Sequence, residues 1–234
     1  MTLTGIKALA FDTGGTVLDW HSGIRAALAE TGQRHGVERD WAAIANAYRR
    51  RALRGMTNQE SPGFNIDDVH GAVLDELAGE HGLTMFSDTD RASIARRWHS
   101  LDAWPDFPDA LTRLRRRHVV VSFTILSVSL IIDTARRNQL SWDAVISCEM
   151  LDVYKPLPKA YQRAAALLQL EPREILMVAC HNFDLDAARG VGYRTCFVQR
   201  PDEWGSAGPP DPVPNPATDL VVSDFVQLAE RMGA

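Results

Sequence analysis

The chain has few cysteines and no long apolar run, and both features narrow its class. Only 3 of its 234 residues are cysteines, and their spacing fits neither a disulfide framework nor a metal-binding pattern. No apolar stretch approaches the roughly 20 residues that a membrane-spanning helix requires. No basic segment followed by an apolar one marks a secretory signal. We therefore expect a cytoplasmic protein that does not enter a membrane.

An excess of positive charge is also absent. The 25 lysines and arginines are outnumbered by 30 acidic residues, which gives a net charge of -5 and disfavours non-specific binding of nucleic acid. The basic run at 113–117 is interpreted as the solvated face of a helix that points Leu111 and Leu114 inward. A hydrophobic content of 45% is typical of a folded globular chain. A homodimer is expected only because twofold dimers are the commonest assemblies.

Hydrophobic periodicity divides the chain into a helical segment and an alternating segment. The apolar run at 7–11 is followed, from about residue 22 to 100, by a pattern that is helical throughout. Beyond residue 104, apolar strands alternate with amphipathic helices, which predicts an α/β fold with a parallel sheet covered on both faces. The later strands are expected at 119–126, 144–147, 175–180, 195–199 and 220–222. The proline-rich stretch 201–216 is expected to be a surface loop near the functional edge of the sheet.

Asp12 is the residue around which a candidate site can be built. It ends the run at 7–11 and begins the turn Thr13-Gly14-Gly15-Thr16, so its carboxylate lies where a strand ends. The two glycines permit a tight turn that exposes backbone N–H groups to a bound anion. Taken alone, the pattern fits equally well an aspartate that caps the following turn. Later segments decide between a nucleophile and a cap.

Polar residues follow later strands at corresponding positions. Because the carboxyl ends of parallel strands meet at one edge of the sheet, these residues should converge on Asp12. Each also has an ordinary structural interpretation, as a helix N-cap, a surface lysine or a histidine bonded to a nearby carbonyl group. The polar residues are Ser127, Lys155, His181, Asn182 and Asp184, the last three in a segment that also contains Phe183.

The order of these segments resembles the four motifs of the haloacid dehalogenase superfamily. The matching segments are 11–16, 126–127, 154–158 and 178–184, so the resemblance covers nearly the whole chain. Within the superfamily the chain resembles the 2-haloacid dehalogenases most, through Thr16 after the glycines, Lys155 within Tyr-Lys-Pro, and Tyr161. The resemblance implies a doubly wound, Rossmann-like core at 1–17 and 103–234, with a helical cap inserted at 18–102.

Two departures from the superfamily's phosphatases bear on the reaction. Those enzymes carry a second acid where this chain has Gly14, and an acid that binds Mg²⁺ where it has Cys180. Glycine and cysteine are poor ligands for a hard cation such as Mg²⁺. A halide, in contrast, leaves as an anion and needs no acid to protonate it. We therefore expect a dehalogenase without metal or other cofactor. The alternatives are an Mg²⁺-dependent phosphatase with a diminished site at Asp12, Asp184 and Asp186, and a catalytically silent binding protein.

The resemblance implies that Asp12 attacks the carbon that bears the halogen in a small anionic 2-haloacid. Water would then hydrolyse the resulting ester. Lys155 would offset the repulsion between two anions, and Ser127, Thr16 and backbone N–H groups would hold the substrate carboxylate. Asp184, with His181 or Asn182, would orient Lys155 and the water. His181 as general base is a further hypothesis. The implied substrate-binding residues are Gly14, Gly15, Trp20, Tyr161, His181, Asn182 and Phe183.

An arginine from the helical segment is expected to bind the leaving halide. The apolar stripe of the helix around residues 41–52 places Arg50 on the opposite face and Arg49 and Arg51 on its flanks. Periodicity does not separate these two, and a run of arginines also fits a solvated face. The aromatic-Arg pattern resembles the family's arginine and selects Arg49. Trp20 and Phe183 would complete an apolar halide pocket, or else are core residues.

Val128 stands where many 2-haloacid dehalogenases carry an asparagine, which removes one side-chain donor. Gly14 stands where the family commonly has an aromatic residue. The first departure leaves turnover and substrate range open, and the second implies a pocket of altered shape.

Overall fold

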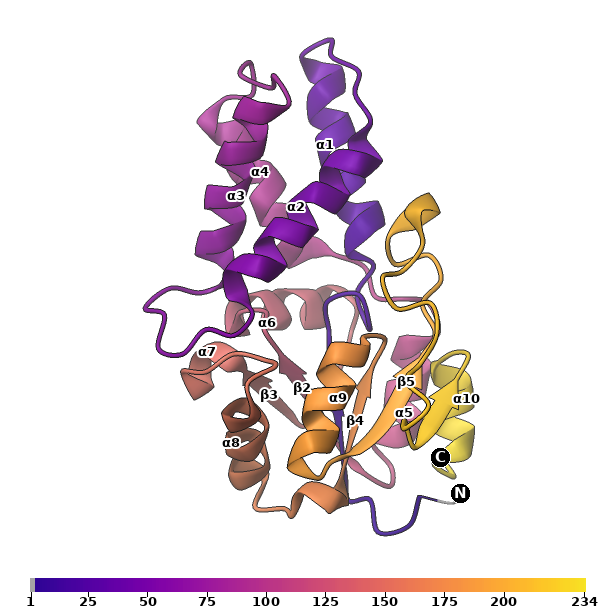
Figure 1. The fold of residues 1–234 in the computed structure, drawn as a ribbon. Helices are drawn as coiled ribbons and strands as arrows, with labels where there is room; N and C mark the ends of the chain where they lie inside the picture. Colours follow the sequence, from indigo (N-terminus) through magenta and orange to yellow (C-terminus); the bar gives the residue numbers. More distant parts are fainter. Residues whose placement is uncertain (1–2) are drawn as a thin grey trace.

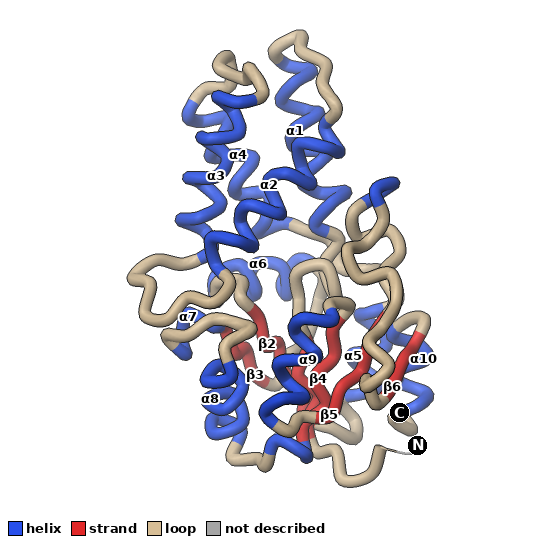
Figure 2. The backbone as a smooth tube through the Cα atoms, viewed as in Figure 1, coloured by secondary structure: helices blue, strands red, loops and turns tan. Residues whose placement is uncertain are grey.

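Six parallel strands form one sheet in the computed structural model, which describes residues 3–234 (Figures 1 and 2). The strand order is β3-β2-β1-β4-β5-β6, so β1 lies in the middle between β2 and β4. This arrangement confirms the predicted doubly wound α/β sheet. The strands are β1 Ala8–Phe11, β2 Val119–Thr124, β3 Ala144–Ser147, β4 Ile175–Ala179, β5 Arg194–Val198 and β6 Leu220–Val222.

Helices cover both faces of the sheet, as Figure 2 shows. Helix α5 packs against α10 and helix α8 packs against α9. Strands β1 and β4 are buried along their whole length, which is why they consist of uninterrupted apolar residues. The helices of this part are α5 Phe107–Leu114, α6 Val128–Arg137, α7 Cys148–Leu151, α8 Pro158–Leu168, α9 Asn182–Val191 and α10 Phe225–Arg231, with short 3-10 turns at Pro172–Glu174 and Gly205–Ala207.

The helical segment lies beyond the carboxyl ends of the strands (Figure 1). Each of its helices begins at a residue whose side chain accepts a backbone N–H, and these N-caps are Asp19, Asp40, Asn65 and Ser87. Within the described chain, no helix is long and apolar enough to cross a membrane. The helices are α1 Trp20–Arg34, α2 Trp41–Met56, α3 Ile66–Glu80 and α4 Asp88–Arg96, followed by the 3-10 turn Arg97–Ser100.

The loop after β5 was expected to be a surface loop, but part of it is buried. It rises beside α1 and α2 (Figure 1), and its residues Glu203 and Trp204 are buried. The Trp204 carbonyl oxygen accepts a hydrogen bond from Asn46, and the Trp204 ring meets Trp20 edge to face at 4.9 Å between centroids. The loop therefore adds a third wall to the space between the sheet and the helical segment.

Candidate active site

Asp12 follows β1, at the centre of the carboxyl edge of the sheet. The residue is buried, with 7% exposed, and its Oδ2 accepts from Thr16 Oγ1 at 2.7 Å and pairs with His181 Nδ1 at 3.2 Å. Oδ1 faces Lys155 Nζ at 3.6 Å and is the less engaged oxygen. Burial opposes ionisation, but Lys155 and His181 hold the pKa of Asp12 well below its ordinary value. An ionised carboxylate with one less engaged oxygen can act as a nucleophile.

Lys155 lies between two carboxylates and is not the surface lysine that its position before a proline also allowed. Only 1% of the residue is exposed, and Nζ donates to Asp184 Oδ2 at 2.8 Å and to the Phe123 carbonyl oxygen at 2.7 Å. Burial disfavours the ammonium group, but Asp184 and Asp12 raise the pKa of Lys155 above its ordinary value. The Tyr161 hydroxyl donates to Asp184 Oδ1 at 2.6 Å. The predicted convergence of these residues is therefore seen in the structure.

His181 connects Asp12 to a carboxylate that the sequence analysis missed. Its Nε2 lies 3.0 Å from Glu203 Oε1, and Trp20 Nε1 donates to the same oxygen at 3.1 Å. Burial disfavours a charged ring, but the carboxylates of Glu203 and Asp12 raise the pKa of His181 well above its ordinary value. Ionised carboxylates only accept hydrogen bonds, so a ring that faces one on each side must carry both protons.

The glycine pair after Asp12 makes room for two side chains from distant elements. A Cβ on Gly14 would lie 2.9 Å from Arg49 Nη2, and one on Gly15 would lie 2.1 Å from Glu203 Oε1. Gly15 also has a φ of +98°, which side chains rarely tolerate. The turn was expected to expose backbone N–H groups, but the N–H of Gly15 donates to the Leu18 carbonyl oxygen.

Of the two arginines left open by periodicity, Arg49 is the one that reaches the site. It is 2% exposed, and its Nη2 donates to the Gly14 carbonyl oxygen at 3.0 Å. Its guanidinium group lies over the rings of Trp20 and Trp98, at 5.7 and 5.4 Å. Its Nε and Nη1 are buried without a partner in the described part of the chain, so they are available to an anion.

Arg51 and Arg50 point elsewhere. Arg51 forms an exposed ion pair with Glu80 at 2.5 Å, and Arg50 is exposed with its guanidinium over the Trp204 ring. The packing of α2 against its neighbours therefore places Arg49, and not Arg51, at the site, which the sequence pattern left open.

Three predicted site residues are placed differently from the expectation. The Ser127 hydroxyl donates to Asp67 Oδ2 of α3 at 2.7 Å and caps α6, so it is already occupied. Asn182 bonds to the loop at 211–215. Phe183 is 41% exposed and therefore cannot line a buried halide pocket, although its ring lies against His181. Burial makes Trp20 the better candidate for the apolar wall.

The residues present do not suit Mg²⁺. Asp186, one of the three carboxylates of the phosphatase alternative, bonds to Arg189 and Asn215. Within residues 3–234, the one close group of side chains able to bind a metal is Cys180, His181 and Glu203. It contains a thiol, whose pKa burial raises to about 11, and an imidazole, and neither is a preferred ligand of Mg²⁺.

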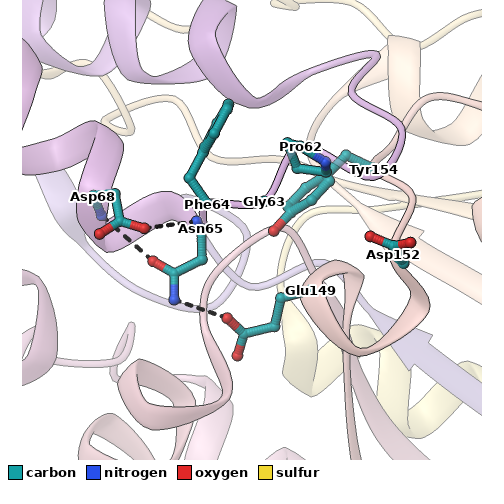
Figure 3. Close-up of a pocket in the computed structure, with 8 residues that line it drawn as sticks. All are labelled: Pro62, Gly63, Phe64, Asn65, Asp68, Glu149, Asp152 and Tyr154. Atoms are coloured by element: carbon teal, nitrogen blue, oxygen red, sulfur yellow. Dashed lines mark hydrogen bonds between the residues drawn. The ribbon is translucent and has the colours of Figure 1, made fainter.

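A cleft of about 310 Å³ opens at the junction of the helical segment and the sheet (Figure 3). Asn65 Nδ2 donates to Glu149 Oε2 at 3.0 Å across this junction, and Glu149 Oε1 accepts from Val128 N at 2.6 Å. The cleft does not include Asp12. Its lining residues are Pro62, Gly63, Phe64, Asn65, Asp68, Glu149, Asp152 and Tyr154.

Comparison with known proteins identifies the family. The family model for haloacid dehalogenase-like hydrolases matches residues 6–192. The chain belongs to this family. The (S)-2-haloacid dehalogenase of Pseudomonas sp. (strain YL) is 26% identical over 200 residues, which span 83% of each chain. The (S)-2-haloacid dehalogenase of Xanthobacter autotrophicus is 28% identical over 202 residues, 83% of this chain and 76% of the relative.

Solved structures of the haloacid dehalogenase-like family agree with this assignment. A defluorinating L-2-haloacid dehalogenase superposes with a TM-score of 0.91 and 32% identity, covering 100% of this chain and 99% of its own. A second L-2-haloacid dehalogenase superposes with a TM-score of 0.89 and 30% identity, covering 97% and 99%. The predicted superfamily is therefore confirmed, and the chain is a hydrolase of the haloacid dehalogenase-like type.

Proposed function

We propose that this hydrolase removes halide from small (S)-2-haloacids through an ester on Asp12. The proposal rests mainly on Asp12, whose carboxylate is buried and ionised. Among residues 3–234, its Oδ1 pairs only with Lys155. Arg49 of α2 donates to the Gly14 carbonyl oxygen in the turn after Asp12, and two of its nitrogens have no partner within residues 3–234. The relatives, which are (S)- and L-2-haloacid dehalogenases, support the substrate class and its configuration.

In the proposed reaction, Asp12 Oδ1 attacks the carbon that bears the halogen and the halide leaves towards Arg49 Nε and Nη1. Lys155 offsets the repulsion between the two anions, and Asp184 and Tyr161 hold Lys155 in place. Water then attacks Cγ of Asp12, and the hydroxy acid departs. Ser127 binds the substrate carboxylate after its hydroxyl has left Asp67.

We also propose that residues 18–102 act as a cap over a core formed by 1–17 and 103–234. Arg49 and Trp20 come from the cap, whereas Asp12, Lys155 and Glu203 come from the core. The reaction site is complete only when both parts are together. The expectations of a homodimer, of no nucleic-acid partner and of a cytoplasmic location stay predictions.

The proposed function is tested by measuring halide release in the presence of EDTA. The substrates are chloro-, bromo- and fluoroacetate and both enantiomers of 2-chloropropionate. We expect release from the haloacetates and from the (S) enantiomer. The release should persist in EDTA, because the mechanism needs no metal. Failure of every substrate, together with Mg²⁺-dependent hydrolysis of phosphate esters, would overturn the proposal in favour of the phosphatase alternative.

Replacing Arg49 by lysine should slow halide release by a factor on the order of 100, because a buried donor to the leaving anion is lost. Arg51→Lys is the matched control, and its rate should stay close to the native one because Arg51 bonds only to exposed acids. The comparison is made on first-turnover rates with bromo- and fluoroacetate. The loss should be larger for fluoride, which is the poorer leaving group. Equal losses in both variants would exclude Arg49 as the halide ligand.

A further inference from the structure

The two oxygens of Asp12 have different surroundings. Oδ2 accepts from Thr16 and faces His181, whereas Oδ1 pairs with Lys155 alone among residues 3–234. If Oδ1 forms the bond to the substrate carbon, Oδ2 becomes the carbonyl oxygen of the ester. Thr16 and His181 therefore already lie beside the oxygen on which negative charge develops when water attacks the ester carbonyl group.

We propose that His181, held by Glu203, and Thr16 form the oxyanion hole in which the Asp12 ester is hydrolysed. This inference rests on the proposed function and concerns its second step. The Thr16 hydroxyl accepts from the Cys180 N–H at 3.1 Å and donates its own proton to Oδ2 at 2.7 Å, a shorter contact than the 3.4 Å to Cys180 Sγ. His181 is therefore an electrophile rather than the general base considered from the sequence.

The charge on His181 follows from the groups that face it. Asp12 lies at one ring nitrogen, Glu203 at the other, and the neutral thiol of Cys180 lies 3.5 Å from Nε2. A ring that carries both protons cannot take a third from water. Ester formation removes the charge of Asp12, and Glu203 then remains as the anion that keeps the ring protonated. The cations of Arg49, which acts on Glu203, and Lys155, which acts on Asp12, partly offset the effect of these carboxylates on the protonation of His181.

The proposed step is balanced in atoms and protons. Water adds to Cγ, the carbonyl electron pair moves to Oδ2, and the water proton passes to Asp184, which keeps unused lone pairs beside its two bonds. When the carbonyl group re-forms, the bond from Cγ to Oδ1 breaks and Lys155 protonates the departing Oδ1. Lys155 then recovers the proton held by Asp184, and the new Asp12 acid loses a proton to solvent.

The experiment separates the two steps by rapid-quench measurement of halide and by mass spectrometry of the protein. With (S)-2-chloropropionate, His181→Gln should release one equivalent of halide at a near-native rate and accumulate the ester. Its hydrolysis should be slower by about 10² to 10³-fold, as for loss of an oxyanion-hole donor. Asp202→Asn, an exposed neighbour of Glu203, should behave like the native enzyme.

The pH profile of ester hydrolysis distinguishes an electrophile from a base. In the native enzyme the rate should be constant at neutral pH and fall as the pH rises through the pKa of His181 in the ester state. In Glu203→Gln the fall should begin at lower pH, because the ring has lost its remaining anion. A rate that instead rises with pH to a plateau, or native hydrolysis in His181→Gln, overturns the inference. Native enzyme that forms no ester contradicts the proposed function itself.

Discussion

Replacing Asp12 by asparagine is expected to lower the first-turnover rate of halide release by a factor on the order of 10⁴ or more. The amide is nearly isosteric but has no anionic oxygen to displace the halide. Thr16 and His181 remain in place around it. Halide is measured by ion chromatography, with Asp202→Asn as the control for a general effect of removing one negative charge.

Isotope labelling tests the role of Asp12 in the native enzyme. In one turnover in H₂¹⁸O, the label should enter the Asp12 carboxylate, because water attacks Cγ and Oδ1 leaves with the product. Mass spectrometry of the peptide that contains Asp12 detects it. Label found only in the hydroxy acid would mean that water attacks the substrate directly, and halide release that persists in Asp12→Asn would lead to the same conclusion.

Lys155→Met is expected to lower the free energy of unfolding by about 3–5 kcal/mol, the usual cost of stranding buried charges. The variant leaves Asp12 and Asp184 facing each other without the ammonium group between them. Lys159→Met is the matched control. Lys159 pairs with Glu60 at the surface, where such pairs contribute about 0–1 kcal/mol. Urea denaturation measures both.

A second substitution and the pH dependence make the Lys155 prediction specific. Adding Asp184→Asn to Lys155→Met should recover part of the loss, because one of the two stranded carboxylates is removed. The pKa of Lys155 is raised in the folded state, so its contribution is fully present below the ordinary value of about 10.4 and is lost as the pH rises through the raised value. Equal stability of Lys155→Met and Lys159→Met at neutral pH would contradict this account.

The fold was largely predictable because its signals are local. The strands β3 and β6 have the predicted bounds, and the other strand ends differ by at most a residue or two. Helix α7 was not predicted, because the four residues of Cys148–Leu151 are too few to show a helical period. The inserted helices were predicted only as a group, from the helical pattern of residues 22–100, and their separate bounds come from the structure.

The site was predictable only where its residues follow strands. Asp12, Lys155 and Asp184 were found because the sheet collects strand ends at one edge. Glu203 was not, because it lies in a proline-rich loop without periodicity, and its approach to Gly15 depends on tertiary packing. The same holds for the bond between Ser127 and Asp67, which joins segments 60 positions apart.

The buried charges around Asp12 sum to zero, and this sum constrains the course of the reaction. Its members are the carboxylates of Asp12, Asp184 and Glu203 and the cations of Arg49, Lys155 and His181. Burial raises the pKa of Asp184 and lowers that of Arg49, but Asp184 is paired with the Lys155 ammonium group at 2.8 Å. A haloacid anion makes the occupied site negative by one, and the excess disappears only when the halide has left the ester. Expulsion of halide thus restores neutrality. An uncharged amide of the same acid would instead leave a net positive intermediate, so discrimination against neutral analogues should arise after the carbon–halogen bond breaks.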